Sequence, residues 1–197
     1  ALAWVRMCEN QPEEAIALLE AAHVARSAAG TRAYWGSALF EVLLWLEQKG
    51  LAPAGMTLEG ELAKLLDAPN PAMHAVAHRF RALLHLRAAE DGDMQAIEMV
   101  DTHLAESERL LRTAGLVPEL VRVLHERARW EQLCGRLDQA ASAREEANRI
   151  LERIDPDAQC CSALGFIRAV IECGRLTSLR PGEGTWGELT ARLCAAL

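Results

Sequence analysis

Residues 120–154 read LVRVLHERARWEQLCGRLDQAASAREEANRILERI, and their periodicity decides the fold class. Small or aliphatic residues recur on one face of each half: Leu120, Leu124, Ala128 and Leu133, then Leu137, Ala140, Ala141, Ala147, Ile150 and Leu151. Such spacing is typical of an amphipathic α-helix. Cys134-Gly135 lies between the halves, and a residue without a β-carbon suits the left-handed end of a helix. The stretch therefore predicts two helices joined by a tight turn.

A helical hairpin this thin cannot bury both apolar stripes, so it is expected to stack against copies of itself. Turn residues recur at intervals of roughly 40 positions, a spacing typical of helical repeats: Asn10, Gly50, Gly92, Gly135 and Gly174. The sequence Cys-Gly-Arg-Leu at 134–137 also returns at 173–176. We therefore predict an all-α fold, an α-solenoid of about four and a half antiparallel helical hairpins.

One helical repeat domain is expected over residues 1–197. Its predicted repeats span approximately residues 1–30, 31–69, 70–115, 116–155 and 156–197. Capping residues and prolines sharpen the helix starts, because Pro fits the first turn and Thr or Asn side chains cap it. The predicted starts are Pro12, the Thr31 cap, Leu58, Asn70-Pro71, Met94 and Pro118, with a Thr185/Glu188 capping box near the C-terminus.

Composition and charge exclude several classes of protein. The net charge of −7 leaves no basic excess to neutralise nucleic-acid phosphates, so direct nucleic-acid binding is not expected. The densest apolar run, residues 38–46, is interrupted by Glu41 and is too short to span a membrane. The six cysteines form no CxxC pair, which favours reduced thiols in a cytoplasmic protein. A strained redox disulfide between Cys160 and Cys161 is the alternative.

The turn at 134–135 resembles the tetratricopeptide repeat. Gly135, Ala140 and Ala147 match that family's turn and second helix, and Ala128 stands where the family has a small residue. The period of the chain is similar to the long-helix variety found in bacterial signal-transduction ATPases and their transcription activators. The resemblance implies a right-handed solenoid with a binding or assembly role, and it implies no particular ligand. Neither end carries a polar capping face, so we expect a segment of a longer multidomain protein.

Motifs for catalysis are missing from the sequence. It contains no GxSxG elbow and no Gly-rich phosphate loop, and we expect neither an enzyme nor a bound cofactor. His74, His78 and His85 share a helix face, and the first two have a spacing that metal ligands use. Arg81 lies on the same face and would repel a cation. We therefore interpret the histidines as a solvated or groove-lining polar strip and expect no metal.

The resemblance also implies a concave groove lined by the first helix of each repeat. Transferred onto this sequence, the groove positions are Trp4, Phe40, Leu44, Arg79, Arg122, His125, Arg129 and Gln132. Arg122 and Arg129 are seven residues apart and share a face, as paired donors for a carboxylate or phosphate require. The alternative is that both pair with Glu126 or with acids of neighbouring helices.

These patterns predict a module that recognises another molecule within a bacterial regulatory protein. The expected partner is a protein or peptide segment, acidic if the arginines contact it, or a small anionic effector. Signal transduction and transcription regulation are the settings that the family resemblance implies. The alternative is a self-association scaffold that builds a homo-oligomer and has no ligand of its own.

Overall fold

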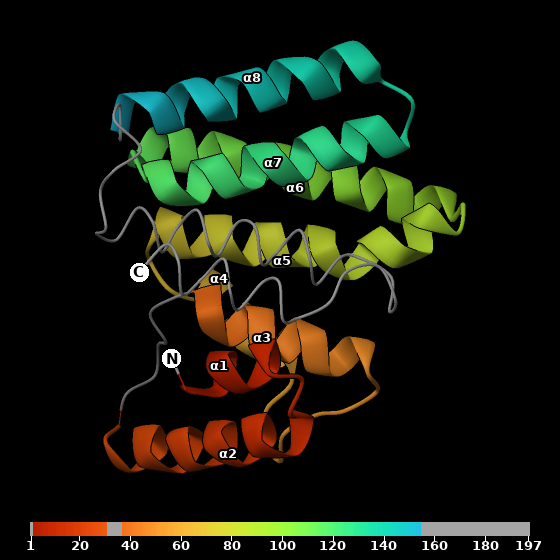
Figure 1. Ribbon diagram of the computed structural model, residues 1–197. Helices are drawn as coiled ribbons and strands as arrows, with labels where there is room; N and C mark the ends of the chain where they lie inside the picture. Colours follow the sequence, from red (N-terminus) through yellow and green to blue (C-terminus); the bar gives the residue numbers. More distant parts are fainter. Residues whose placement is uncertain (1, 31–36, 155–197) are drawn as a thin grey trace. The chain divides into compact units, whose positions relative to one another are not determined.

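A computed structural model describes residues 2–30 and 37–154 of the chain, and every regular element in them is helical (Figure 1). The helices are α1 (Leu2–Cys8), α2 (Pro12–Ala28), α3 (Ser37–Gln48), α4 (Leu58–Leu66), α5 (Pro71–Glu90), α6 (Met94–Ala114), α7 (Val117–Leu133) and α8 (Leu137–Ile154). The all-α prediction is confirmed for this part of the chain. The Thr31 cap, the fifth repeat (156–197), the Thr185/Glu188 box and the Cys160-Cys161 pair lie outside the described residues.

Helix starts follow the capping chemistry that the sequence indicates. The Asn70 side chain accepts a hydrogen bond from the Ala72 amide at 2.9 Å, and Pro71 occupies the first turn of α5. Asp93 accepts from the amides of Gln95 and Ala96 at 2.9 and 3.3 Å. Each side-chain acceptor satisfies amides that have no partner inside the helix. The predicted starts of α5 and α6 are therefore confirmed.

The four predicted turn residues that the structure describes adopt the left-handed backbone that stops a helix, and Gly174 lies outside the described residues. Gly135 has φ of 73°, and Asn10 is the one non-glycine residue with positive φ in the described part of the chain, at 56°. Asparagine tolerates this region better than other residues with a β-carbon. Asn10 therefore does between α1 and α2 what Gly135 does between α7 and α8.

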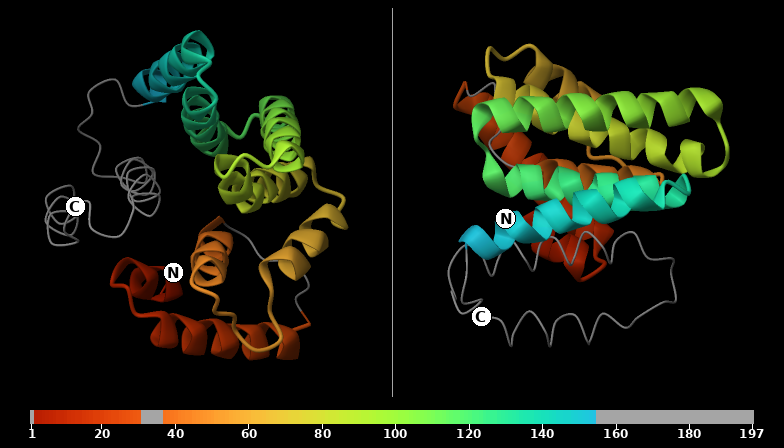
Figure 2. Two further views of the ribbon diagram at one scale, coloured as in Figure 1. Left: turned by 90° about the vertical axis from the view of Figure 1, so that its right-hand side faces the viewer. Right: turned by 90° about the horizontal axis from the view of Figure 1, so that it is seen from above.

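The chain divides into two compact units, an N-terminal unit (Ala1–Glu119) and a C-terminal unit (Leu120–Leu197). In the N-terminal unit, α1 packs against α2 and α3, while α3 packs against α4 and α5. Helix α4 also contacts α5, and α5 and α6 lie side by side as a hairpin (Figure 2). Each helix of this unit is therefore held mainly by helices close to it in sequence.

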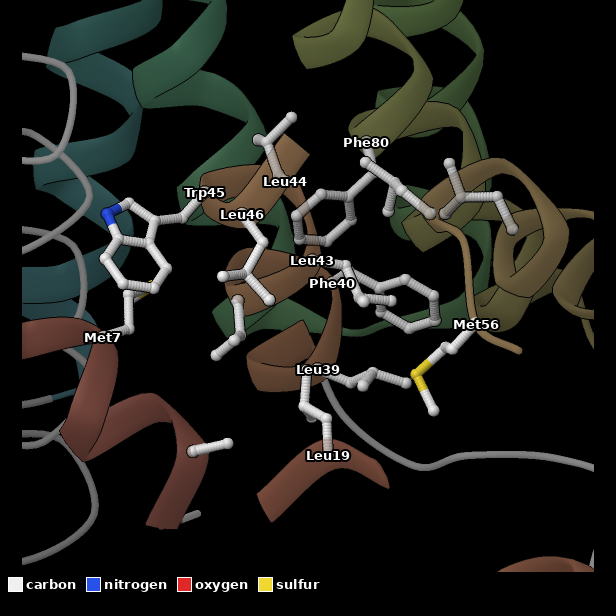
Figure 3. Packing of buried hydrophobic residues seen from close by; sticks show 14 of the residues in the cluster. Met7, Leu19, Leu39, Phe40, Leu43, Leu44, Trp45, Leu46, Met56 and Phe80 are labelled. Atoms are coloured by element: carbon white, nitrogen blue, oxygen red, sulfur yellow. The ribbon is translucent and has the colours of Figure 1, made fainter. Parts of the chain in front are cut away.

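Helix α3 is the centre of the N-terminal core. Every residue from Leu39 to Leu46 except Glu41 is buried, so this helix is apolar on nearly all faces, as expected of a helix enclosed by others. Its Phe40 ring lies beside Phe80 of α5, with 5.4 Å between the ring centroids (Figure 3). Burial of each such side chain stabilises the fold by about 1.5–3 kcal/mol.

In the C-terminal unit, most of the apolar stripe predicted from residues 120–154 is buried, but Leu133 and Leu137, on either side of the turn, are 52% and 65% exposed, which corrects the prediction for these two residues. Leu124, Ala128 and Ala147 are at most 2% exposed, and Ile150 is 8% exposed. Helix α7 also buries Val121, Val123 and Trp130, which lie outside that stripe. Helix α7 therefore buries more of its circumference than a single apolar stripe with four-residue spacing would cover.

Candidate functional site

The groove predicted for the N-terminal unit is not an open surface. Phe40 is 1% exposed and Leu44 is 9% exposed, so both side chains belong to the core around α3. Arg79 is also buried, at 4% exposure, and only Trp4 on α1 remains partly exposed. The groove assignments of Phe40, Leu44 and Arg79 are therefore corrected, because these three side chains are buried inside the N-terminal unit.

Arg79 is neutralised inside the N-terminal unit. Its Nη2 donates to Glu41 Oε1 at 2.9 Å, and its Nη1 lies 3.8 Å from Glu119 Oε2. Ser37 Oγ donates to the other Glu119 oxygen at 3.2 Å, and the guanidinium lies 4.7 Å from the centre of the Phe80 ring. A buried guanidinium is tolerated only when carboxylates and hydrogen bonds compensate its lost hydration. Arg79 is thus an internal ion-pair residue.

The remaining groove residues lie on α7, within the C-terminal unit. Arg122, His125 and Arg129 are partly exposed and Gln132 is exposed. Their spacings of three, seven and ten residues place them on one side of the helix. The Gln132 side chain accepts a hydrogen bond from Arg144 of α8 at 3.0 Å. We call these four residues the α7 basic face.

Acidic residues lie close to the α7 basic face. Arg122, His125 and Arg129 each take part in a polar, ring or electrostatic interaction inside the chain, as does Glu126. The neighbouring Glu131 is buried at 3% exposure and pairs with Arg127 at 3.5 Å and closely with Arg136. Arg122 and Arg129 could thus contact a ligand or pair inside the chain, and these two roles are separated by the experiment described below.

The three histidines of α5 do not form one solvated strip. His74 lies with Nε2 2.7 Å from the Ala68 carbonyl oxygen, next to the turn before its own helix. His78 and His85 instead face α6 and contact His103. We call His78, His85 and His103 the imidazole cluster. The interpretation of a solvated or groove-lining strip is therefore corrected for His78 and His85.

His103 is the centre of the imidazole cluster. Its Nδ1 lies 2.9 Å from His78 Nδ1, and its ring stacks on His85 with 6.2 Å between centroids. Burial, with smaller contributions from the nearby His78, Arg81 and His85, lowers the pKa of His103 to about 4, while Glu59 opposes them. Burial also lowers the pKa of His78. His78 and His103 are therefore neutral at pH 7.

Sequence reasoning missed His103 because it followed histidines along one helix only. A signal existed in α6, where His103 falls in the buried stripe formed by Ala96, Val100, His103, Ser107 and Leu111. A histidine inside an apolar stripe indicates contact with another helix. Among the described residues, no group of three His, Cys, Asp or Glu side chains is placed to hold a metal ion.

Comparison with protein-family models, curated proteins and solved structures finds no match to this chain. Among residues 2–30 and 37–154, no helix combines the length and the hydrophobicity that crossing a bilayer requires. The candidate binding surface is thus defined by this chain's own residues, the α7 basic face. The imidazole cluster is a separate feature of the N-terminal unit.

Proposed function

We propose that this chain is a tetratricopeptide-like, right-handed α-solenoid that serves as a recognition module in a cytoplasmic bacterial regulatory protein. Its partner is a protein or peptide segment, or a small anionic effector, and the chain itself is not an enzyme. The order of packing in the N-terminal unit supports a solenoid. Helix α1 packs against α3 and α3 against α5, so the first helix of each hairpin meets the first helix of the next. Helical repeats stack in this way.

The α7 basic face is the surface that we assign to ligand contact. The carrying observation is that Arg122, His125 and Arg129 share one side of α7 and stay partly exposed, whereas Arg79 is buried. Guanidinium groups present several N–H donors in a plane and can hold a carboxylate or phosphate with two hydrogen bonds. An acidic peptide segment fits this chemistry best.

The test is the double substitution Arg122→Glu and Arg129→Glu, with a fluorescein-labelled peptide of alternating Glu and Asp as the probe. Fluorescence anisotropy should show affinity reduced at least tenfold, which corresponds to about 1.4 kcal/mol. Circular dichroism should show a melting temperature changed by no more than a few degrees, because substitutions at an exposed face usually change stability little. A large loss of melting temperature would mean that both arginines are internal pairing residues.

The matched control is Arg149→Glu with Arg153→Glu on α8. It makes the same change in net charge on exposed side chains of the same unit. Among the described residues, Arg149 forms one ion pair, with the exposed Glu145 at 3.3 Å. Peptide affinity should change by less than about twofold if direct contact matters, since surface charges are screened beyond roughly 10 Å. If both double variants lost peptide affinity equally, the effect would come from the net charge of the chain and not from direct contact with Arg122 and Arg129.

Self-association is the second candidate function, and α1 carries the observation that favours it. Leu2 is 68% exposed and Val5 is 42% exposed, while Trp4 beside them is partly exposed. Apolar side chains gathered on one short helix can form part of an interface between two copies. Sedimentation velocity separates the two candidates. A dimer that Leu2→Glu with Val5→Glu converts to monomer would favour the scaffold, and a concentration-independent monomer would favour recognition.

A further inference from the structure

The seam between α5 and α6 contains a buried imidazole with an unused nitrogen. His103 is 8% exposed, and its Nε2 has no hydrogen-bond partner among the described residues. The ring lies against two other imidazoles, with centroids 5.1 Å from His78 and 6.2 Å from His85. Three imidazole rings from two helices therefore form part of the packing that holds this hairpin closed.

The His78–His103 contact limits how many protons the pair can hold. Two Nδ1 atoms 2.9 Å apart are at hydrogen-bond distance, so one must carry hydrogen and the other must accept it. If both rings were imidazolium, two N–H groups would point at each other. The closed hairpin thus excludes the fully protonated pair.

Among the described residues, the carboxylates near the imidazole cluster are already bound by arginines. Helix α5 contributes His74 and Arg81, and α6 contributes Glu106 and Arg109. From α4, Glu59 accepts a hydrogen bond from Arg81 at 2.5 Å, and within α6 Glu106 is bound by Arg109 at 2.6 Å. Helix α3 also packs on α5, and its Glu41 is bound to Arg79. Each of these three carboxylates already pairs with an arginine.

We propose that the imidazole cluster is a proton-operated latch on the α5–α6 hairpin, closed while His78 and His103 are neutral and released as they take up protons. Opening separates His103 from His78, so two N–H groups no longer have to face each other. It also hydrates the rings, so burial no longer disfavours their charged forms. The released hairpin would expose the apolar seam that includes Ala75, Val100 and Leu104, all at most 3% exposed in the closed form. This latch lies in the N-terminal unit and does not depend on any ligand of the α7 basic face.

The direction and size of the effect follow from linkage. The pKa of His103 is about 4 in the closed hairpin, below the ordinary value near 6.5 that an opened, hydrated ring would have. Because the closed form has the lower pKa, its advantage is complete above pH 6.5 and is lost as pH falls from there toward 4. For His103 alone, the open fraction should be about thirtyfold larger at pH 5 than at pH 8.

Hydrogen–deuterium exchange of the whole chain, read by mass spectrometry at pH 8 and pH 5, tests the latch. After correction for intrinsic exchange rates, amides of α5 and α6 should open about thirtyfold more often at pH 5. The variant His103→Phe keeps an aromatic ring that cannot titrate, and its ratio between the two pH values should fall to within about threefold. Unchanged protection in the wild type, or a full pH response in His103→Phe, would overturn the proposal.

Two further measurements keep the test decisive if His103→Phe folds poorly. The control variant His23→Gln changes a histidine of α2 that lies outside the cluster, and it should retain the whole pH response of α5 and α6. In the wild type, the NMR signal of the His103 ring should show a neutral imidazole down to pH 5. A His103 ring that titrates near pH 6.5 would contradict the latch without any variant.

Discussion

At the scale of single residues, the charged side chains buried in the described part of the N-terminal unit occur in ion pairs. Arg79 with Glu41 and Arg26 with Glu61 join helices far apart in sequence. We expect Glu41→Gln to lower the free energy of unfolding by about 3 kcal/mol, because it removes the carboxylate that pairs with the buried Arg79 at 2.9 Å. Urea denaturation measures the change.

The control for Glu41→Gln is Glu145→Gln on α8. Glu145 also pairs with an arginine, Arg149, but both side chains are more than half exposed. Exposed pairs contribute less than about 1 kcal/mol, so this variant should unfold almost as the wild type does. If the two substitutions had the same small effect, burial would not be what makes the Arg79 pair important.

Glu61 gives the chain an acid-sensitive contribution to stability. Burial by itself raises the pKa of Glu61, but hydrogen bonds from Lys64 at 2.5 Å and Arg26 at 3.2 Å outweigh it and lower the pKa below the ordinary value. The folded carboxyl thus has a lower pKa than the unfolded one, so its contribution is present above about pH 4.5 and lost as pH falls through the folded pKa.

Lys64→Met tests this contribution. The variant should be less stable than the wild type at pH 7, and the difference between them should shrink as pH falls from 7 to 3, because protonation of Glu61 removes its attraction to Lys64. Urea melts at the two pH values give the comparison, and the effect of the histidines cancels because both proteins contain them. A difference that stays constant from pH 7 to pH 3 would contradict this account of Glu61.

At the scale of elements, the sequence predicts helix ends better than helix surroundings. Met94, Gly115 and Asn70-Pro71 mark the ends of α5 and α6 because capping and left-handed turns depend on a few adjacent residues. The enclosure of Phe40 depends on α5, about 40 residues away, and no pattern along α3 reports it. The same reason explains why three of the eight predicted groove residues proved to be core or ion-pair residues.

The turn between α1 and α2 offers a test at this scale. Asn10→Ala places an ordinary side chain at φ of 56° and should cost about 1 kcal/mol, because a β-carbon is crowded in the left-handed region. Asn10→Gly removes the crowding and should match or exceed the wild-type stability. Thermal melting by circular dichroism ranks the three proteins. Equal destabilisation by Ala and Gly would show that the Asn10 side chain itself, and not its backbone, stabilises the turn.

At the scale of the whole molecule, each unit has its own core. Leu62 of α4 is fully buried in the N-terminal unit, and Leu124 of α7 is 1% exposed in the C-terminal unit. In stacked helical repeats, stability is approximately a sum over neighbouring elements, so damage to one core need not spread through the chain. Local unfolding should therefore differ between the two units.

Leu62→Ala and Leu124→Ala form a matched pair for this prediction, since each removes the same atoms from a buried site and should cost about 3 kcal/mol locally. Hydrogen–deuterium exchange should become faster in α3, α4 and α5 for Leu62→Ala, with little change in α8. For Leu124→Ala the faster amides should lie in α7 and α8, with α1 and α2 unchanged. If either substitution accelerated exchange equally in all the described helices, the chain would unfold as one cooperative body, and the nearest-neighbour stability expected of a helical repeat would not apply to it.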